Sequence, residues 1–93
     1  MECREVTFSR HALLRMFERG ISRAEVHEVL RTGEIIVSYP DDKPHPSHLM
    51  LGFVGSRALH VVVAVDTARG RCIIVSAYVP DLSLWEKTYR RRK

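Results

Sequence analysis

Three polar residues, His60, Ser76 and Tyr78, interrupt two apolar runs near the end of the chain, "ALHVVVAV" and "RCIIVSAYV". Both runs are rich in β-branched residues and are typical of strands, in which successive side chains point to opposite faces of a sheet. In the first run the odd positions 59–65 are all apolar, which leaves His60 on the other face. In the second run we assign the apolar face to positions 73, 75, 77 and 79. The alternation therefore predicts that His60, Ser76 and Tyr78 share one open face of a sheet.

These residue types could cleave RNA. Metal-free cleavage needs a base for the 2′-hydroxyl proton, an acid for the leaving oxygen and cations for the phosphate charge. A histidine exchanges a proton near neutral pH, and a phenol can donate one. We therefore assign proton transfer to His60 and Tyr78, and RNA contact to Ser76. The alternative is that all three are solvent-facing polar residues of a half-buried strand.

A second candidate set recurs every four positions in "SRHALLRMFERGIS", residues 9–22: His11, Arg15 and Arg19. The pattern predicts a helix over residues 10–19 with Ser9 as its N-cap and Gly20 at its end. On the helix this stripe lies opposite a broad apolar arc, which we expect to pack on the sheet. The arc consists of Ala12, Leu13, Leu14, Met16 and Phe17. We predict that His11 and Arg15 stabilise phosphate charge and that Arg19 binds RNA. For His11, a structural role at the helix start is the alternative.

The remaining elements follow from caps, turns and periodicity. Ser22 and Glu25 have the spacing of a capping box, and Gly33 ends the second helix. Four strands are expected at residues 34–39, 49–54, 58–65 and 71–79, and their short connections make them antiparallel neighbours. The sequence thus predicts one α+β domain over residues 1–93. Two N-terminal helices (10–32) pack on a four-stranded antiparallel sheet (34–79), and a basic tail (80–93) follows.

The loop over residues 40–48 holds two aspartates and two histidines, types that bind divalent metals. Pro44 and Pro46 keep this segment extended and prevent convergence on one ion. We therefore interpret it as a polar surface loop and expect no metal site. The four residues are Asp41, Asp42, His45 and His48.

The tail ends in "RRRK", which supplies four positive charges to a chain whose net charge is +4. We expect Arg90 and Arg91 to contact nucleic acid. Trp85 and Tyr89 are four positions apart and would share one side of a short helical turn. Packing on the core is the favoured interpretation for them, and base stacking is the alternative.

The composition is that of a folded protein, with 45% hydrophobic and 28% charged residues. The longest apolar run, "VVVAV", is far shorter than the ~20 residues that span a bilayer. The first ten residues lack the apolar segment of a signal peptide, so we expect a cytoplasmic protein without a membrane partner. Cys3 and Cys72 form no CxxC pair, which indicates neither a zinc site nor a disulfide framework. Cys72 is expected to be a buried small hydrophobe, and no cofactor is expected.

The segments "RHALLRMFERGIS", "EVHEVLRTGEII", "LHVVVAV" and "SAYVPD" closely resemble a bacterial family of small domains of unknown function. That family is grouped with RelE-like and barnase-like ribonuclease toxins. The resemblance covers nearly the whole chain and implies a RelE-like fold with two helices on a four-stranded antiparallel sheet. Members often lie beside a gene for a small zinc-finger protein of the antitoxin type. The resemblance therefore implies a cognate antitoxin, of the zinc-finger type, as a partner.

Together these patterns predict a toxin-type endoribonuclease that uses metal-independent acid–base chemistry and is neutralised by its antitoxin. The first alternative is a non-catalytic module of the same fold that binds RNA or protein through the same face. The second is a folded but inactive relic of a toxin. The sequence specifies neither the preferred RNA sequence nor the oligomeric state.

Overall fold

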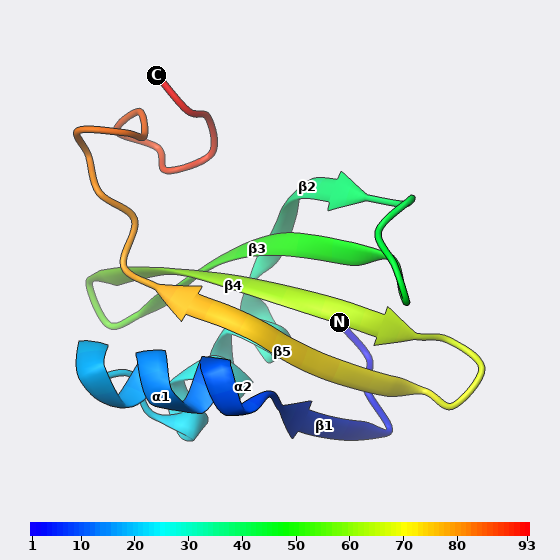
Figure 1. Ribbon diagram of the computed structural model, residues 1–93. Coiled ribbons are helices and arrows are strands. Elements are labelled where there is room, and N and C mark those ends of the chain that lie inside the picture. Colours follow the sequence, from blue (N-terminus) through cyan, green and yellow to red (C-terminus); the bar gives the residue numbers. More distant parts are fainter.

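The computed structural model describes residues 1–93 as an α+β fold in which one curved sheet carries two helices (Figure 1). The helices lie on one side of the sheet, and the C-terminal segment extends from the last strand on the other side. In chain order the elements are β1 (Glu5–Phe8), α1 (Arg10–Arg19), α2 (Arg23–Thr32), β2 (Glu34–Tyr39), β3 (Ser47–Val54), β4 (Arg57–Asp66) and β5 (Arg71–Tyr78).

The sheet has five strands in the order β1-β5-β4-β3-β2, and it is mixed. β2 to β5 run antiparallel to one another, whereas β1 pairs with β5 in parallel, with Glu5 opposite Arg71. The predicted four-stranded antiparallel sheet with helices at the start of the chain is therefore wrong. A strand of four residues is too short to show a reliable alternation, and β1 forms by pairing with the edge of a strand distant in sequence.

The helix boundaries follow from the caps expected from the sequence. The Ser9 hydroxyl accepts a hydrogen bond from the Ala12 amide, and Gly20 ends α1 in the left-handed conformation with φ of 66°. Ser22 and Glu25 form a complete capping box at the start of α2. The two predicted helices and their start signals are confirmed.

The main core lies between the sheet and the helices. Gly52 on β3 allows a close approach here, because a Cβ atom at this position would lie only 2.9 Å from Val29 of α2. The thirteen buried members are Ala12, Met16, Ile21, Val26, Val29, Leu30, Met50, Leu59, Val61, Val63, Cys72, Ile74 and Ala77.

Two expectations about this core are corrected. On α1, Leu14 and Phe17 are 59% and 86% exposed, because the helix packs mainly along β5 and buries only a narrow stripe. On β5, Ile74 faces the helices, and the predicted Ile73 and Val75 do not belong to the core cluster. The β4–β5 register shifts between Val62 and Val63, so Val75 of β5 has no partner on β4. This extra residue reverses the expected alternation of side chains in the part of β5 that precedes it.

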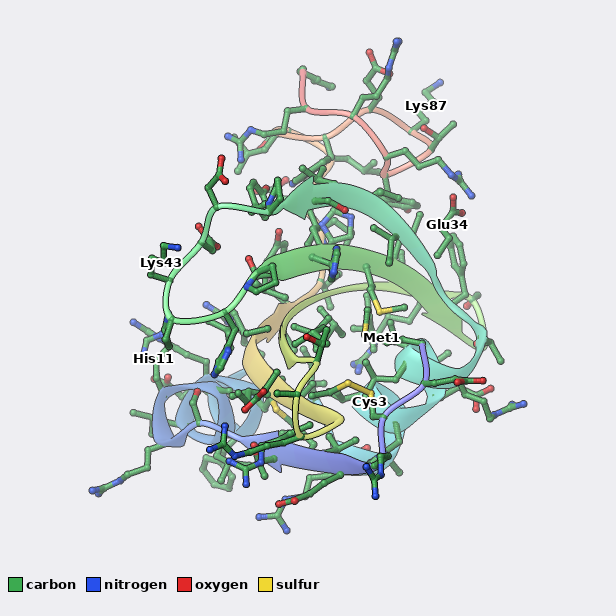
Figure 2. All side chains as sticks on the ribbon, turned by 90° about the vertical axis from the view of Figure 1, so that its right-hand side faces the viewer. Met1, Cys3, His11, Glu34, Lys43 and Lys87 are labelled. Atoms are coloured by element: carbon green, nitrogen blue, oxygen red, sulfur yellow. A yellow bond between two sulfur atoms is a disulfide. The ribbon has the colours of Figure 1, made fainter.

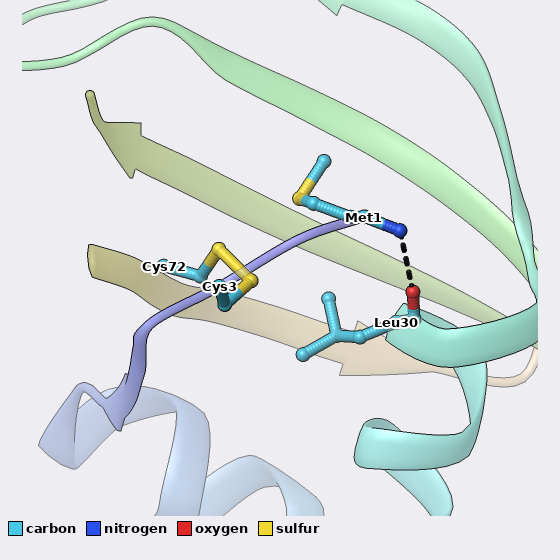
Figure 3. Close-up of a disulfide and its surroundings, with 4 residues drawn as sticks. All are labelled: Met1, Cys3, Leu30 and Cys72. Carbon is cyan, nitrogen blue, oxygen red and sulfur yellow. Dashed lines mark hydrogen bonds between the residues drawn. A yellow bond between two sulfur atoms is a disulfide. The ribbon is translucent and has the colours of Figure 1, made fainter. Parts of the chain in front are cut away.

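A disulfide joins Cys3, just before β1, to Cys72 on β5 (Figure 3). The prediction that no disulfide is indicated is wrong, because the parallel pairing of β1 with β5 brings together two cysteines 69 positions apart. The burial expected for Cys72 is confirmed, since its exposed fraction is 0%. Beyond the disulfide, the Met1 amino group donates a hydrogen bond to the Leu30 carbonyl at 2.8 Å. The start of the chain is thus fastened to both β5 and α2.

Neither helix has the length and apolar character needed to cross a bilayer. The cytoplasmic location stays a prediction. The disulfide is more typical of oxidising compartments than of the reducing cytosol, and so it argues against that prediction.

The C-terminal segment, residues 80–93, contains no helix, and the expected helical turn is wrong. It doubles back on itself, with an isolated β-bridge between Trp85 and Arg92 and a hydrogen bond from the Glu86 amide to the Arg91 carbonyl. Trp85 is only 5% exposed, and its ring lies 4.5 Å from the His60 ring. Core packing of Trp85 is therefore confirmed, but on the face opposite the helices.

Candidate active site around Tyr78

His60 and Tyr78 are direct partners across the β4–β5 ladder, and Ser76 follows two pairs further along, opposite Val62. Residues that alternate with the helix-facing Leu59, Val61 and Ala77 must point to the other side of the sheet. The structure therefore brings His60, Ser76 and Tyr78 together on the face opposite the helices, as the alternation predicts. Their chemical roles stay predictions.

The surroundings of His60 differ from the expected open face. Its side chain is completely buried, because Trp85 and the Tyr89 backbone cover it. Packing of Trp85 on the core is expected from the sequence, but its place over His60 is not, because the C-terminal segment lacks a regular period that would indicate where it packs. His60 therefore cannot touch a substrate directly.

The hydrogen bonds of His60 define which ring nitrogen carries its proton. Nε2 lies 2.8 Å from the Tyr89 carbonyl oxygen, which can only accept, so the proton belongs on Nε2. Nδ1 is then free to accept a hydrogen bond from the Tyr78 hydroxyl, 3.2 Å away. Burial lowers the pKa of His60 below its usual 6.5, while the Tyr89 carbonyl partly opposes this effect. The ring is thus a neutral acceptor for the phenol at pH 7.

Tyr89 itself adopts an unusual backbone conformation. Its φ of 64° lies in the left-handed region, which is uncommon for a residue with a side chain. Its carbonyl accepts the His60 N–H bond, and its ring packs edge-on against Phe53, with centroids 6.2 Å apart. A left-handed backbone conformation is unfavourable for tyrosine, and these two contacts stabilise it here.

Tyr78 is the accessible member of the pair, with a half-buried side chain. Burial is the main cause that raises the pKa of its hydroxyl above 10, and the neighbouring Tyr39 adds to the increase. The positive charges of Arg92 and Arg19 act in the opposite direction. No carboxylate forms an ion pair with either arginine.

Both arginines are held by other contacts. Arg19 donates to the Ala77 carbonyl at 2.9 Å, at the end of β5. Arg92 lies over the Trp85 ring, 5.6 Å from its centroid. The last turn of α1 and the C-terminal segment thus each bring one cation to Tyr78. Together they form the Tyr78 cluster, which consists of Tyr78, His60, Arg19 and Arg92.

The rest of the helix stripe lies outside this cluster. His11 is exposed and forms no hydrogen bond or ion pair, and Arg15 is exposed with Glu18 at 3.5 Å. Neither residue contributes to the charge that acts on Tyr78. Of the three stripe residues, only Arg19 reaches the sheet, because it alone lies at the end of α1 beside β5.

The two predicted RNA-binding arginines of the tail are also separate from Tyr78. Arg90 forms an ion pair with Glu34 of β2, and Arg91 is exposed. Sequence reasoning missed Arg92, which the fold brings to the phenol. Nothing local distinguishes Arg92 from its two neighbours, because its position depends on how the C-terminal segment doubles back.

The four residues proposed as alternative metal ligands are dispersed. Asp42 accepts a hydrogen bond from Ser47, His45 lies 3.8 Å from Asp66, and His48 bonds Ser38. The structure contains no group of three or more histidine, cysteine or carboxylate side chains that could hold a metal.

Chemically, the Tyr78 cluster combines a phenol, a neutral buried proton acceptor and two cations. Such a set can move a proton and stabilise negative charge on an oxyanion. We found no match to this chain among curated proteins or among solved structures. A family model matches residues 8–79, which contain all of α1 to β5 but not the C-terminal segment that covers His60. The chain therefore belongs to the family described as a domain of unknown function, DUF4258.

Proposed function

We propose that this protein is a metal-independent endoribonuclease of the toxin type and that Tyr78 transfers the proton. The observation that carries the proposal is the Tyr78 hydroxyl bonded to a buried neutral histidine, with two arginines free of carboxylate partners held at the Ala77 carbonyl and over the Trp85 ring. A phosphodiester needs these same elements, a proton acceptor and positive charge, at its transition state.

In the proposed reaction, the Tyr78 oxygen takes the proton of the ribose 2′-hydroxyl and passes its own proton to Nδ1 of His60. The 2′-oxygen forms a bond to phosphorus while the bond to the 5′-oxygen breaks, and that oxygen takes a proton from water. The products are a 2′,3′-cyclic phosphate and a 5′-hydroxyl. The imidazolium then returns its extra proton to solvent through Tyr78.

His60 is a positioning residue and proton store in this scheme. Once protonated, both of its ring nitrogens donate, Nε2 to the Tyr89 carbonyl and Nδ1 to the Tyr78 oxygen. The Tyr89 carbonyl favours the charged ring, which offsets part of the cost of burial. Arg19 and Arg92 stabilise the charge that develops on the phosphate oxygens.

The test is cleavage of a mixed RNA in EDTA by the wild type, Tyr78→Phe and Tyr89→Phe. Loss of the Tyr78 hydroxyl should lower the rate by about 100-fold or more, the usual contribution of a proton-transfer group. Tyr89→Phe is the matched control, because it removes a tyrosine hydroxyl without changing the carbonyl that binds His60. Cleavage ends should be cyclic phosphates. Equal rates for Tyr78→Phe and the wild type would contradict the mechanism.

The arginines allow a second comparison in the same assay. Arg92→Gln should reduce cleavage by about 100-fold, as for other groups that stabilise transition-state charge. Lys87→Gln removes a positive charge from the same C-terminal segment and should leave the rate unchanged. Equal losses in the two variants would indicate a general effect of charge on RNA binding.

A non-catalytic RNA-binding module is the second candidate. The complete burial of His60 favours it, because a buried histidine under Trp85 also serves simply to fasten the C-terminal segment. RNA that is retained by the protein but remains intact would support this candidate. The cognate antitoxin of zinc-finger type stays part of the proposal, and co-purification with the product of a neighbouring gene would test it.

A further inference from the structure

A groove lies on the same sheet face as Tyr78, where the loop between β2 and β3 overhangs the strands. Its volume is about 330 Å³, at the small end of the range for ligand cavities. Figure 2 shows Lys43 in this loop at the left of the view, with Met1 and Cys3 to its right, near the middle. The floor is apolar and the overhanging wall is polar. The floor consists of Val62, Ala64, Ile73 and Val75, and the wall of Asp42, Lys43, Pro44, His45 and Ser47.

The groove lies close to the Tyr78 cluster on the same face of the sheet. Val62 of the groove floor pairs with Ser76, and Tyr78 lies two residues further along β5 on the same face. Two residues of a strand span about 7 Å, so the groove begins one short step from the phenol. A molecule bound at Tyr78 can therefore extend into the groove without leaving the sheet.

The loop wall is fixed by side-chain contacts. The Ser47 hydroxyl, itself only 4% exposed, donates to Oδ2 of Asp42. His45 lies 3.8 Å from Asp66, a carboxylate that also binds Arg69. These contacts leave Oδ1 of Asp42 without a protein partner at the mouth of the groove, where it can accept hydrogen bonds from a ligand.

We propose that this groove binds the nucleobase adjacent to the cleaved phosphate and that Asp42 makes it selective for guanine. The flat apolar floor suits the face of an aromatic base. Guanine presents two adjacent donors, N1–H and the 2-amino group, which match the free Oδ1 of Asp42 and the second lone pair of Oδ2, whose first lone pair accepts from Ser47. Adenine and cytosine present an amino group without an adjacent N–H, and uracil presents a single N–H. The positive charge of Lys43 suits a neighbouring phosphate.

This inference rests on the proposed ribonuclease function for its location, but its binding test does not need cleavage. The protein would be titrated with GMP, AMP, CMP and UMP while NMR follows the methyl groups of Val62, Ile73 and Val75. We expect GMP to shift these signals and to bind at least about tenfold more tightly than the other three, as for bidentate base recognition.

Two variants and one control locate the effect. Asp42→Asn should remove the preference for GMP, whereas Asp41→Asn alters an adjacent aspartate that does not line the groove and should keep it. Val62→Phe should block all four nucleotides by filling the groove while it leaves Asp42 in place. Equal affinity for the four nucleotides, or GMP shifts that persist in Val62→Phe, would overturn the proposal.

Mapping of cleavage sites separates this inference from the proposed function. Guanine-selective binding without cleavage would support the groove and contradict the ribonuclease. Cleavage without base preference, together with no methyl shifts, would support the ribonuclease and overturn the groove. Cleavage next to guanine that becomes unselective in Asp42→Asn would support both.

Discussion

The two faces of the sheet share the same strands but are covered in different ways. On the helix face, α1 and α2 close over a core of thirteen apolar residues, and the Cys3–Cys72 disulfide lies at its edge. On the opposite face, the cover consists of irregular segments, the 40–46 loop at one end and residues 80–93 at the other. His60 is buried there with a partner for each of its ring nitrogens. The first face holds most of the core, and the second holds the sites that we propose for chemistry and binding.

The largest expected effect on stability is at the edge of the helix face. The disulfide closes a loop between residues 69 positions apart, and its removal should cost about 4 kcal/mol by the chain-entropy relation. The double variant Cys3→Ala, Cys72→Ala would be compared with the wild type by urea denaturation, with and without a reductant. The wild type should lose stability in reductant and the variant should not. A wild type that is indifferent to reductant would contradict this role.

Substitutions of two neighbouring valines allow a direct comparison of how tightly the two faces are packed. Val61 is fully buried under the helices, and Val62 is half-buried in the opposite groove. Val61→Ala should destabilise the fold by about 2 kcal/mol, because it leaves a cavity in a closed core, and Val62→Ala by less than about 1 kcal/mol. Urea denaturation of both variants measures the difference. Equal losses would show that both faces are packed alike.

The pH dependence of stability tests the burial of His60 on the face opposite the helices. The pKa of His60 is lower in the folded protein than its usual 6.5, so the unfolded chain binds more protons between these two values. Stability should therefore decrease as the pH falls below about 6.5, down to the folded pKa. His60→Gln should weaken this decrease, while the control His11→Gln, at an exposed position, should retain it. Thermal melts from pH 8 to pH 5 would measure it, and an unchanged slope in His60→Gln would contradict the assignment.

The smallest effect is expected at the outer edge of the C-terminal cover. Arg90 pairs with Glu34 of β2, and both side chains are largely exposed. Exposed ion pairs contribute little and are screened by salt. Arg90→Gln should lower the melting temperature slightly in low salt and not at all in high salt. A large loss at both salt concentrations would mean that this contact holds the whole segment in place.

The sequence predicts best those features that depend on near neighbours. The caps at Ser9 and Ser22 and the shared face of His60 and Tyr78 follow from local spacing, and the structure has all of them. The alternation fails on β5 because an extra residue near Val75 shifts the register, and apolar residues occupy both faces there. A bulge of this kind leaves no mark in a run of β-branched residues.

Features that depend on distant pairing could not be derived in the same way. β1, the Cys3–Cys72 disulfide and the cover over His60 all require segments from opposite ends of the chain to meet. The same is true of the Tyr78 cluster, since Arg19 binds the Ala77 carbonyl from α1 and Arg92 lies over Trp85 near the end of the chain. The pattern predicted that His60 and Tyr78 share one face, and their proposed roles stay predictions. The fold brings to this end of the sheet different cations from most of those expected.

The central claim is that Tyr78 donates its proton to a buried, neutral His60. Nitrogen-15 NMR of the histidine side chains at pH 7, with His60→Gln to assign the signal, tests it most directly. We predict a proton on Nε2, which faces the Tyr89 carbonyl, and none on Nδ1, which faces Tyr78. A proton on Nδ1, or a charged ring at this pH, would contradict the claim, because Tyr78 would then have no acceptor for its proton.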